Sequence, residues 1–358
     1  MGAFFSCQSS QAIMYRRFSL SRIPHLITLA FLAALMHAQG AGPAASPQGV
    51  IHRLDPALDN LIAPHASLKV VHSGASGFFE GPSWVPGAPG YFIFSDIPGD
   101  TLYRVGPGGK VAELVQEVQP RSAPVTAPDG MIGPNGTTIS PSGLIAYCVF
   151  GGGRIEELNR HGQRKVVVSA LQDGHALTLP NDLVYRSDGL LYFTQEGGAY
   201  LVRPEQNPVR LDGTKNPNGI AFSPGEKYLY LTEHPDKIVR FEVEANGWIR
   251  DPRLFVDMSL DDPAGRLKDP SPRSGGFVDG VKVDKDGNVW AVGPGGVWIL
   301  TPDGRHIGTI LTPVARFTNL AFGGDDGRTL FLTAPEGVYS LQLASSRVRP
   351  RITSERRK

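Results

Sequence analysis

Short apolar runs separated by turn residues fill most of the chain and predict strands rather than helices. After residue 66 the apolar and β-branched runs are only a few residues long, as in YFIFSD at 91–96 and LYLTE at 229–233. Most of these runs end near Gly, Pro, Asp, Asn or Ser, which are the residues that form turns. The pattern therefore predicts an all-β protein rich in hairpins.

Pairs of such runs recur six times and have a common layout. The copies are EGPSWVPGAPGYFIFSD, PNGTTISPSGLIAY, PNDLVYRSDGLLYF, PNGIAFSPGEKYLY, VDGVKVDKDGNVWA and TNLAFGGDDGRTLFL. One polar residue opens the first run of each copy, and these opening residues are Glu80, Asn135, Asn181, Asn218, Asp279 and Asn319. In four copies a turn glycine stands eight positions later: Gly143, Gly189, Gly287 and Gly327. In the fourth copy that position holds Glu226, just after the turn glycine Gly225.

The spacing of the copies indicates a particular β architecture. The shortest interval between opening residues runs from 181 to 218 and the longest from 218 to 279, and further strand-like runs fill each interval. About four strands per repeat at this period predict a six-bladed β-propeller over residues 67–343. We expect SLKVVHS at 67–73 to close the ring by pairing with GVYSLQL at 337–343. A β-sandwich or a pair of barrels is the alternative, but neither explains the recurring polar position.

Composition adds limits on partners and location. The 358 residues carry a net charge of +1 and are 41% hydrophobic and 19% charged, which gives no reason to expect a nucleic-acid partner or an acidic membrane surface. A basic start and an apolar run over 26–36, followed by small residues, predict a signal peptide and leader over 1–40, cleaved near 38–41. The run is too short to span a bilayer, so we expect a periplasmic or secreted protein, by the Sec or the twin-arginine route, with a retained membrane anchor as the alternative.

The rest of the chain is divided as follows. Residues 41–66 are an N-terminal extension, and 344–358 form a basic tail that we expect to be disordered. Cys148 is the one cysteine beyond the leader, so no internal disulfide is expected. We expect the protein to be a monomer.

The opening residues are candidate ligands of a metal ion. The innermost strands of a propeller line a central channel, so equivalent positions of six blades converge there. The predicted ring holds two carboxylates and four amides and no lysine, arginine or histidine. Such oxygen ligands suit a hard divalent cation, with Ca²⁺ the best fit and Zn²⁺, Mn²⁺ or Mg²⁺ also open. For each asparagine the alternative is a turn residue that bonds to its own backbone.

From about residue 75 to 342 the chain resembles the gluconolactonase/regucalcin (senescence marker protein) family of metal-dependent lactonases. The resemblance rests on EGPSW, FSDI and the runs that begin PND, PNG, VDG and TNL, in this order. It implies a six-bladed propeller with one catalytic divalent ion at the mouth of the channel. Carried over by motif, it makes Glu80, Asn218 and Asp279 metal ligands. Asn181 is then a fourth ligand or the residue that holds a water molecule on the ion.

Two loops depart from the family pattern. Where bacterial gluconolactonases commonly carry Cys-Glu-His-Gly, this chain keeps Cys148 but loses the Glu and His, and Gln195-Glu196 stands where they tend to carry Asp-Pro. Cys148 is expected to be a small buried residue rather than a nucleophile. Candidate substrate-binding residues near the channel are Asn135, Arg154, Glu196 and His234.

The resulting functional hypothesis is an exported hydrolase that opens a small-molecule lactone or sugar-derived ester. The ion would polarise the carbonyl, Asp279 would accept the proton of the attacking water, and Asn181 would orient the reactants. Two alternatives remain open: an aryl-ester or phosphotriester hydrolase, and a non-catalytic propeller stabilised by calcium that binds a sugar or a partner.

Overall fold

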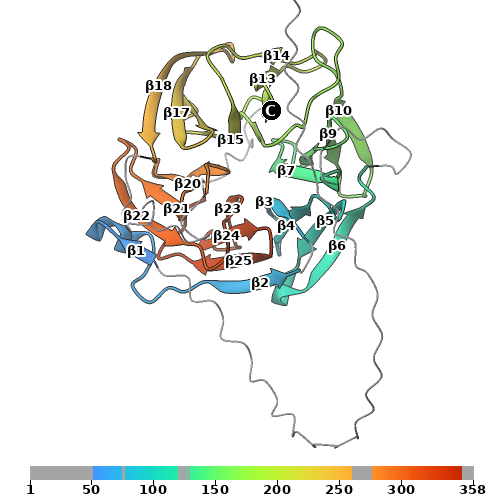
Figure 1. Ribbon diagram of the computed structural model, residues 1–358. Helices are drawn as coiled ribbons and strands as arrows, with labels where there is room; N and C mark the ends of the chain where they lie inside the picture. The colour runs from blue at the N-terminus through green and yellow to red at the C-terminus, as the bar shows by residue number, and fades with distance from the viewer. Residues whose placement is uncertain (1–50, 75–76, 120–126, 128–129, 260–275, 349–358) are drawn as a thin grey trace, which may run out of the picture. The chain divides into compact units, whose positions relative to one another are not determined.

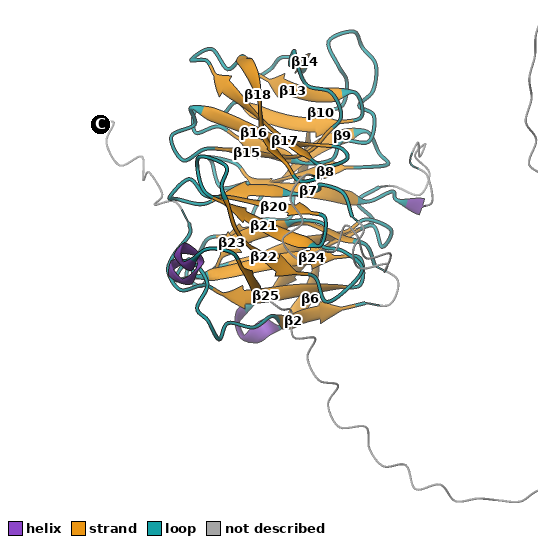
Figure 2. Cartoon of the chain, turned by 60° about the vertical axis from the view of Figure 1, so that its left-hand side comes forward, coloured by secondary structure: helices purple, strands orange, loops and turns teal. Residues whose placement is uncertain are grey.

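The described part of the chain is built almost entirely of antiparallel β-sheets (Figures 1 and 2). The computed structural model describes residues 51–74, 77–119, 127, 130–259 and 276–348. These belong to the second of two compact units, Met1–Ala44 and Ala45–Lys358. The predicted signal peptide therefore lies outside the described residues, as does the tail beyond 348.

Six sheets form the blades, in agreement with the predicted fold class. The first blade holds β3 (Phe79–Val85), β4 (Tyr91–Asp96), β5 (Thr101–Val105) and β6 (Val111–Gln116), with the 3-10 turn η2 (Pro107–Gly109) between the last two. The second holds β7 (Pro134–Ile139), β8 (Ile145–Val149), β9 (Arg154–Leu158) and β10 (Arg164–Val168). The third holds β11 (Leu183–Tyr185), β12 (Leu191–Gln195), β13 (Gly198–Val202) and β14 (Val209–Arg210). The fourth holds β15 (Pro217–Phe222), β16 (Tyr228–Glu233), β17 (Lys237–Val243) and β18 (Ile249–Asp257).

The last two blades each take a strand from the start of the described chain. The fifth holds β19 (Val281–Val283), β20 (Val289–Gly293), β21 (Gly296–Leu300) and β22 (His306–Leu311), with β1 (Ile51–Arg53) added at its edge. The sixth holds β23 (Leu320–Gly323), β24 (Thr329–Ala334) and β25 (Gly337–Gln342), completed by β2 (Lys69–Ser73). β2 pairs antiparallel with β25, with Val70 opposite Tyr339. The closure expected from the sequence is therefore present.

The first strands of neighbouring blades contact one another around a full circle. β3 contacts β7, β7 contacts β11, β11 contacts β15, β15 contacts β19, β19 contacts β23, and β23 contacts β3. Figure 1 shows β3, β7 and β23 near the centre of this ring and β6, β10 and β22 at its rim. Each blade thus presents the start of its first strand to a shared axis.

The turn after each first strand explains the recurring glycines. Gly143, Gly189, Gly287 and Gly327 all have φ between 68° and 94°, the left-handed region that favours glycine. In the fourth blade the left-handed residue is Glu226, with φ 55°, and not the neighbouring Gly225 predicted to be the turn glycine. The Glu226 backbone N–H still donates to the carbonyl of Ser223, which closes the same turn. The hairpin geometry is therefore kept there without glycine.

The N-terminal extension and the start of the predicted tail pack against the blades. The 3-10 turn η1 (Pro56–Asn60) and the residues after it bury Leu58 and Ile62 in a core cluster with Trp290 and Phe317 of the fifth and sixth blades. Part of the segment predicted to be a disordered tail is ordered, because Arg347 is 4% exposed and pairs with Asp284 and Asp286. These ion pairs fix the backbone at least as far as Arg347. Among the described residues, no helix is long and apolar enough to cross a membrane.

Candidate functional site

The opening residues lie where the first strands meet, and contacts between neighbouring and between distant blades bring several of them together. The Asn319 amide donates from Nδ2 to Glu80 Oε2 over 3.1 Å, which joins the sixth blade to the first. The same nitrogen lies 3.4 Å from Oδ2 of Asp182, in the third blade. Glu80 and Asp279 are 4% and 5% exposed. Burial, followed by repulsion from Glu80, raises the pKa of Asp279, so the two carboxylates belong to one buried cluster.

The glycine that follows most opening residues lets adjacent blades approach closely. The Gly136 backbone N–H donates to the carbonyl of Asn181 over 2.8 Å, so the second blade is joined to the third. A Cβ on Gly219 would lie 2.6 Å from the carbonyl oxygen of Asp279, a distance that real Cβ atoms do not show. Glycine therefore follows the opening residue because the neighbouring blade packs against it, and not only because a turn requires it.

Hydroxyl groups on the second strands strengthen the same junctions. Ser95 of β4 donates to the carbonyl of Asn135 over 2.6 Å. Thr194 of β12 and Thr232 of β16 donate to the carbonyls of the opening residues Asn218 and Asp279 over 2.5 and 2.6 Å. The backbones that carry the opening residues are thus held in fixed positions, which is what a binding site requires.

The two predicted carboxylate ligands are electrostatically unfavourable without a cation. Burial, followed by repulsion from Asp182, raises the pKa of Glu80 to about 7, although the Gly81 N–H and the Asn319 amide bond to its carboxylate. Burial and repulsion from Glu80 raise the pKa of Asp279 well above its usual value, against the nearby Arg316. A positive charge placed between these carboxylates would lower both pKa values.

The six opening positions hold no cationic residue, but cationic side chains from other positions lie beside them. Lys282 Nζ lies 3.2 Å from Asp182 Oδ2 and 3.3 Å from Asn319 Oδ1, and Arg316 Nη1 lies 3.8 Å from Asp279 Oδ2. Both side chains start outside the opening positions and reach the cluster from the fifth and sixth blades. Asp182, which sequence reasoning missed, is a third carboxylate and is 1% exposed. Its signal was the PND motif, in which an acid replaces the glycine found in four of the other five copies.

The donor set still fits a divalent cation. Three carboxylates, Glu80, Asp182 and Asp279, face two cations, Lys282 and Arg316, which leaves one negative charge without a partner. The side-chain oxygens of Asn135 and Asn218 are buried and accept no hydrogen bond from any described residue. Carboxylate and amide oxygens are the ligands that Ca²⁺ prefers. No group of three or more His, Cys, Asp and Glu with metal-binding geometry occurs in the described ranges, so the amides are needed to complete a ligand set.

The asparagines divide between the two roles considered for them. Asn319 Oδ1 accepts from the N–H of the next residue, Leu320, which is the local bond expected of a turn asparagine. Asn135 and Asn218 have no such bond to their oxygens. Asn181 is half-buried, and its backbone N–H donates to the carbonyl of Thr194. Ligation by Glu80, Asn181, Asn218 and Asp279 stays a prediction.

The predicted substrate-binding residues have different surroundings. His234 Nε2 is 3.3 Å from Nδ2 of Asn218, so this histidine borders the cluster, and burial together with Arg316 lowers its pKa. The Arg154 guanidinium donates hydrogen bonds to Glu156, Gln119 and the carbonyl of Val118. These contacts give Arg154 a structural role, because they connect the second blade to the segment that follows the first. Glu196 is exposed. For Arg154 and Glu196 substrate contact stays a prediction without support in these contacts.

Cys148 occupies the position in β8 that corresponds to the hydroxyl residues Ser95, Thr194 and Thr232. It is fully buried, and burial followed by the charges of Asp182 and Glu80 raises its pKa well above the usual value. A thiol held in its neutral form is a poor nucleophile. This agrees with the expected packing role.

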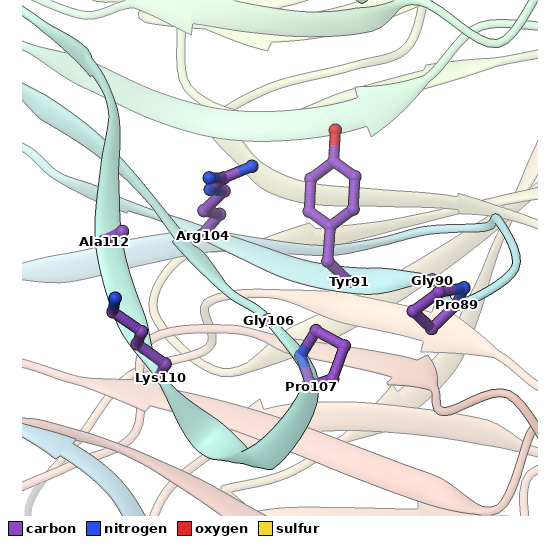
Figure 3. A pocket seen from close by; sticks show the side chains of 8 residues that line it. All are labelled: Pro89, Gly90, Tyr91, Arg104, Gly106, Pro107, Lys110 and Ala112. Carbon is purple, nitrogen blue, oxygen red and sulfur yellow. The ribbon is translucent and has the colours of Figure 1, made fainter.

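A pocket elsewhere on the first blade is separate from this cluster. It encloses about 380 Å³ and is lined by residues that include Tyr91, Arg104 and Lys110. Figure 3 shows these three side chains rising from neighbouring strands and the turn between them. Tyr91 is at the opposite end of β4 from Ser95, and no opening residue lines the pocket.

The fold and the cluster together define a six-bladed β-propeller with acids and amides gathered at the start of its inner strands. A family model described as SMP-30/Gluconolactonase/LRE-like region matches residues 78–336. The chain belongs to this family.

Curated relatives and solved structures agree with the assignment. The chain is 27% identical over 351 residues to a gluconolactonase of Zymomonas mobilis, covering 88% of this chain and 94% of the relative. It is 26% identical to a pentonolactonase of Haloferax volcanii, covering 72% and 81%. The structure of a gluconolactonase from Xanthomonas campestris has a TM-score of 0.68 at 24% identity and covers 86% of this chain and 99% of its own. At that identity the structural likeness supports the fold alone.

Proposed function

We propose that this protein is a metal-dependent hydrolase that opens a lactone ring. The observation that carries the proposal is the buried Glu80–Asp279 cluster with unpartnered amide oxygens beside it, in a chain of the SMP-30/gluconolactonase family. The curated relatives named as gluconolactonase, 6-deoxy-6-sulfogluconolactonase and pentonolactonase support an enzyme of the lactone hydrolase class. A sugar-derived lactone is the substrate class that their names suggest.

Glu80, Asn218 and Asp279 would hold the cation, with Asn181 as a further ligand or as the residue that positions water. When bound, a divalent cation supplies polarisation of the substrate carbonyl and stabilisation of the negative charge that develops on its oxygen. Ca²⁺ suits these oxygen donors best, and a regucalcin of Agrobacterium tumefaciens, similar in fold, is named a calcium-binding protein.

Asp279 is the proposed general base. Its carboxylate lies beside Asn218 and Arg316, at the centre of the cluster, where it can accept a proton from a water molecule held there. Asp279 takes one proton from a water molecule, whose oxygen forms a bond to the acyl carbon. The bond between the acyl carbon and the ring oxygen then breaks, and that oxygen receives the proton from Asp279 to become a hydroxyl group. One water is consumed, and the hydroxy acid formed ionises in solution.

His234 and Asn135 are the two remaining residues proposed to contact the substrate. His234 is held mainly neutral at neutral pH by its lowered pKa, so it can exchange hydrogen bonds with sugar hydroxyls without adding charge near Arg316. Asn135 offers its unpartnered oxygen to a hydroxyl donor or to the ion.

Lactone hydrolysis measured before and after chelation tests the proposal. Acid release from D-glucono-1,5-lactone is followed at constant pH, with the spontaneous rate subtracted, and a panel of other lactones, an aryl ester and a phosphotriester is run beside it. We expect turnover of a lactone that disappears with chelator and returns with Ca²⁺, Mn²⁺ or Zn²⁺. Turnover that survives complete chelation would exclude the metal mechanism, and no turnover of any lactone would exclude the enzyme class.

We also propose that the mature protein is an exported monomer without a membrane anchor. The support is the leader-like pattern of residues 1–40, whose apolar run over 26–36 is too short to span a bilayer. Cell fractionation combined with N-terminal sequencing tests this, and an uncleaved chain in the cytoplasm would contradict it.

A further inference from the structure

Arg316 borders the cluster with a hydrogen-bonding group that has no partner. It lies just before β23, and its guanidinium stacks 4.3 Å from the ring centre of Phe277 and 5.2 Å from that of Phe78. Nη1 is buried and makes no hydrogen bond to any described residue. The nearest carboxylate oxygen, Oδ2 of Asp279, is 3.8 Å away, too far for a hydrogen bond.

These contacts restrict what the guanidinium can bind. The guanidinium lies over the rings of Phe277 and Phe78, so its polar contacts are left to the edge that carries the N–H groups. A buried N–H without an acceptor is costly, so a ligand that supplies the acceptor would bind here favourably. The edge of a guanidinium matches a carboxylate or an oxyanion, which can accept two parallel hydrogen bonds. The geometry therefore indicates an oxygen acceptor that arrives with a ligand.

The position of Asp279 indicates which end of the ligand this is. Asp279 is the proposed proton acceptor, so the acyl carbon under attack has to lie near its carboxylate. Arg316 Nη1 is 3.8 Å from that carboxylate, and it therefore faces the acyl end of a bound lactone rather than its distal hydroxyl groups.

We propose that Arg316 binds the acyl oxygens of the substrate. It donates to the carbonyl oxygen while negative charge develops there during attack, and it then holds the carboxylate of the ring-opened hydroxy acid. This inference rests on the proposed lactone hydrolysis, and it adds a residue that touches the reacting atoms and a reason for the product to bind. A purely structural counter-charge for Asp279 is the competing role.

Product binding separates the two roles without requiring turnover. Calorimetric titrations in Ca²⁺ compare D-gluconate, which carries a carboxylate, with D-glucitol, its neutral analogue. The proteins are the wild type, Arg316→Met, Arg316→Lys and the control Arg240→Met. Arg240 also stacks on two rings, Tyr228 at 4.5 Å and Phe255 at 5.8 Å, but on the outer strand β17.

We expect Arg316→Met to lose about 10- to 100-fold in gluconate affinity, with Arg316→Lys intermediate and Arg240→Met unchanged. Glucitol binding should not change in any variant. Lactone kcat should fall in Arg316→Met more than KM rises, since the contact strengthens as charge develops. Thermal melts confirm that each variant is folded.

The inference is overturned if the wild type and folded Arg316→Met bind gluconate with equal affinity, whether that affinity is high or low. That result leaves the proposed function intact if the wild type hydrolyses lactones. If instead the wild type binds gluconate through Arg316 but opens no lactone, the carboxylate-binding site is supported and the proposed hydrolysis is refuted.

Discussion

Replacing Glu80 with glutamine should stabilise the protein when no metal is bound and remove the stabilisation that a metal provides. Glu80 is buried next to Asp182 and Asp279, and its pKa is raised from 4.5 to about 7. In the unfolded chain the carboxylate ionises near 4.5, whereas in the folded chain it holds its proton up to about 7. The stability that this group contributes is therefore complete below pH 4.5 and is lost as the pH rises through about 7.

The size of the effect follows from the two pKa values. Each pH unit between them corresponds to about 1.4 kcal/mol, so the ionised side chain costs roughly 3 kcal/mol above pH 7. Glutamine keeps an oxygen for the Gly81 N–H and loses the attraction to Lys282, so we expect a gain of about 1–3 kcal/mol in the free energy of unfolding at pH 8. For a domain of this size this raises Tm by about 2–4 °C per kcal/mol. At pH 4.5 the two proteins should be nearly equal.

The assay is chemical and thermal denaturation in chelator at pH 4.5 and pH 8, repeated at pH 8 with Ca²⁺. Ca²⁺ should raise the stability of the wild type, since it binds the folded state, and should leave Glu80→Gln almost unchanged. Glu113→Gln, on the exposed face of β6, is the control and should show neither effect. Destabilisation of Glu80→Gln in chelator at pH 8, or a full response of this variant to Ca²⁺, would refute the reasoning.

Two further substitutions test the blade junction and the proposed base. Gly219→Ala should destabilise the fold by about 1–3 kcal/mol and disturb Asp279, because its Cβ would lie 2.6 Å from the Asp279 carbonyl oxygen. Gly225→Ala, where a Cβ meets nothing within 4 Å, should be neutral in the same melts. Asp279→Asn should keep the fold and lower lactone kcat by about 10²- to 10⁴-fold, since an amide cannot accept the proton. An active Asp279→Asn variant would assign the base to another residue.

The number of blades, the closing strand and the position of the cluster could be predicted because each leaves a repeated signal. In five of the six copies the opening residue stands eight positions before a left-handed turn residue, and six copies of one hairpin have to converge when they close a ring. The blade-to-blade contacts at Gly136 and Gly219 impose that signal on the sequence. The same argument explains the position of Glu80. Its apolar neighbours pack within the blade, whereas its own carboxylate lies at the start of the strand and faces the central axis.

The cationic partners could not be predicted because their contacts join different blades. Lys282 is 100 positions from Asp182, and the length of its side chain, rather than any local pattern, brings the two together. Arg154, for which substrate contact stays a prediction, shows that a short-range contact can also be overlooked. It was chosen because it lies in a loop that departs from the family, yet the buried Glu156 that holds it is only two residues away. Sequence reasoning found the backbone positions and missed the reach of long side chains.

Calorimetric titration of the chelated protein with Ca²⁺ near pH 8 tests the central claim most directly. If acids and amides from separate blades hold one cation, the titration should show one ion bound per chain. The affinity should be strongly reduced in Glu80→Gln. The absence of binding at millimolar Ca²⁺, or binding of equal strength in this variant, would contradict it.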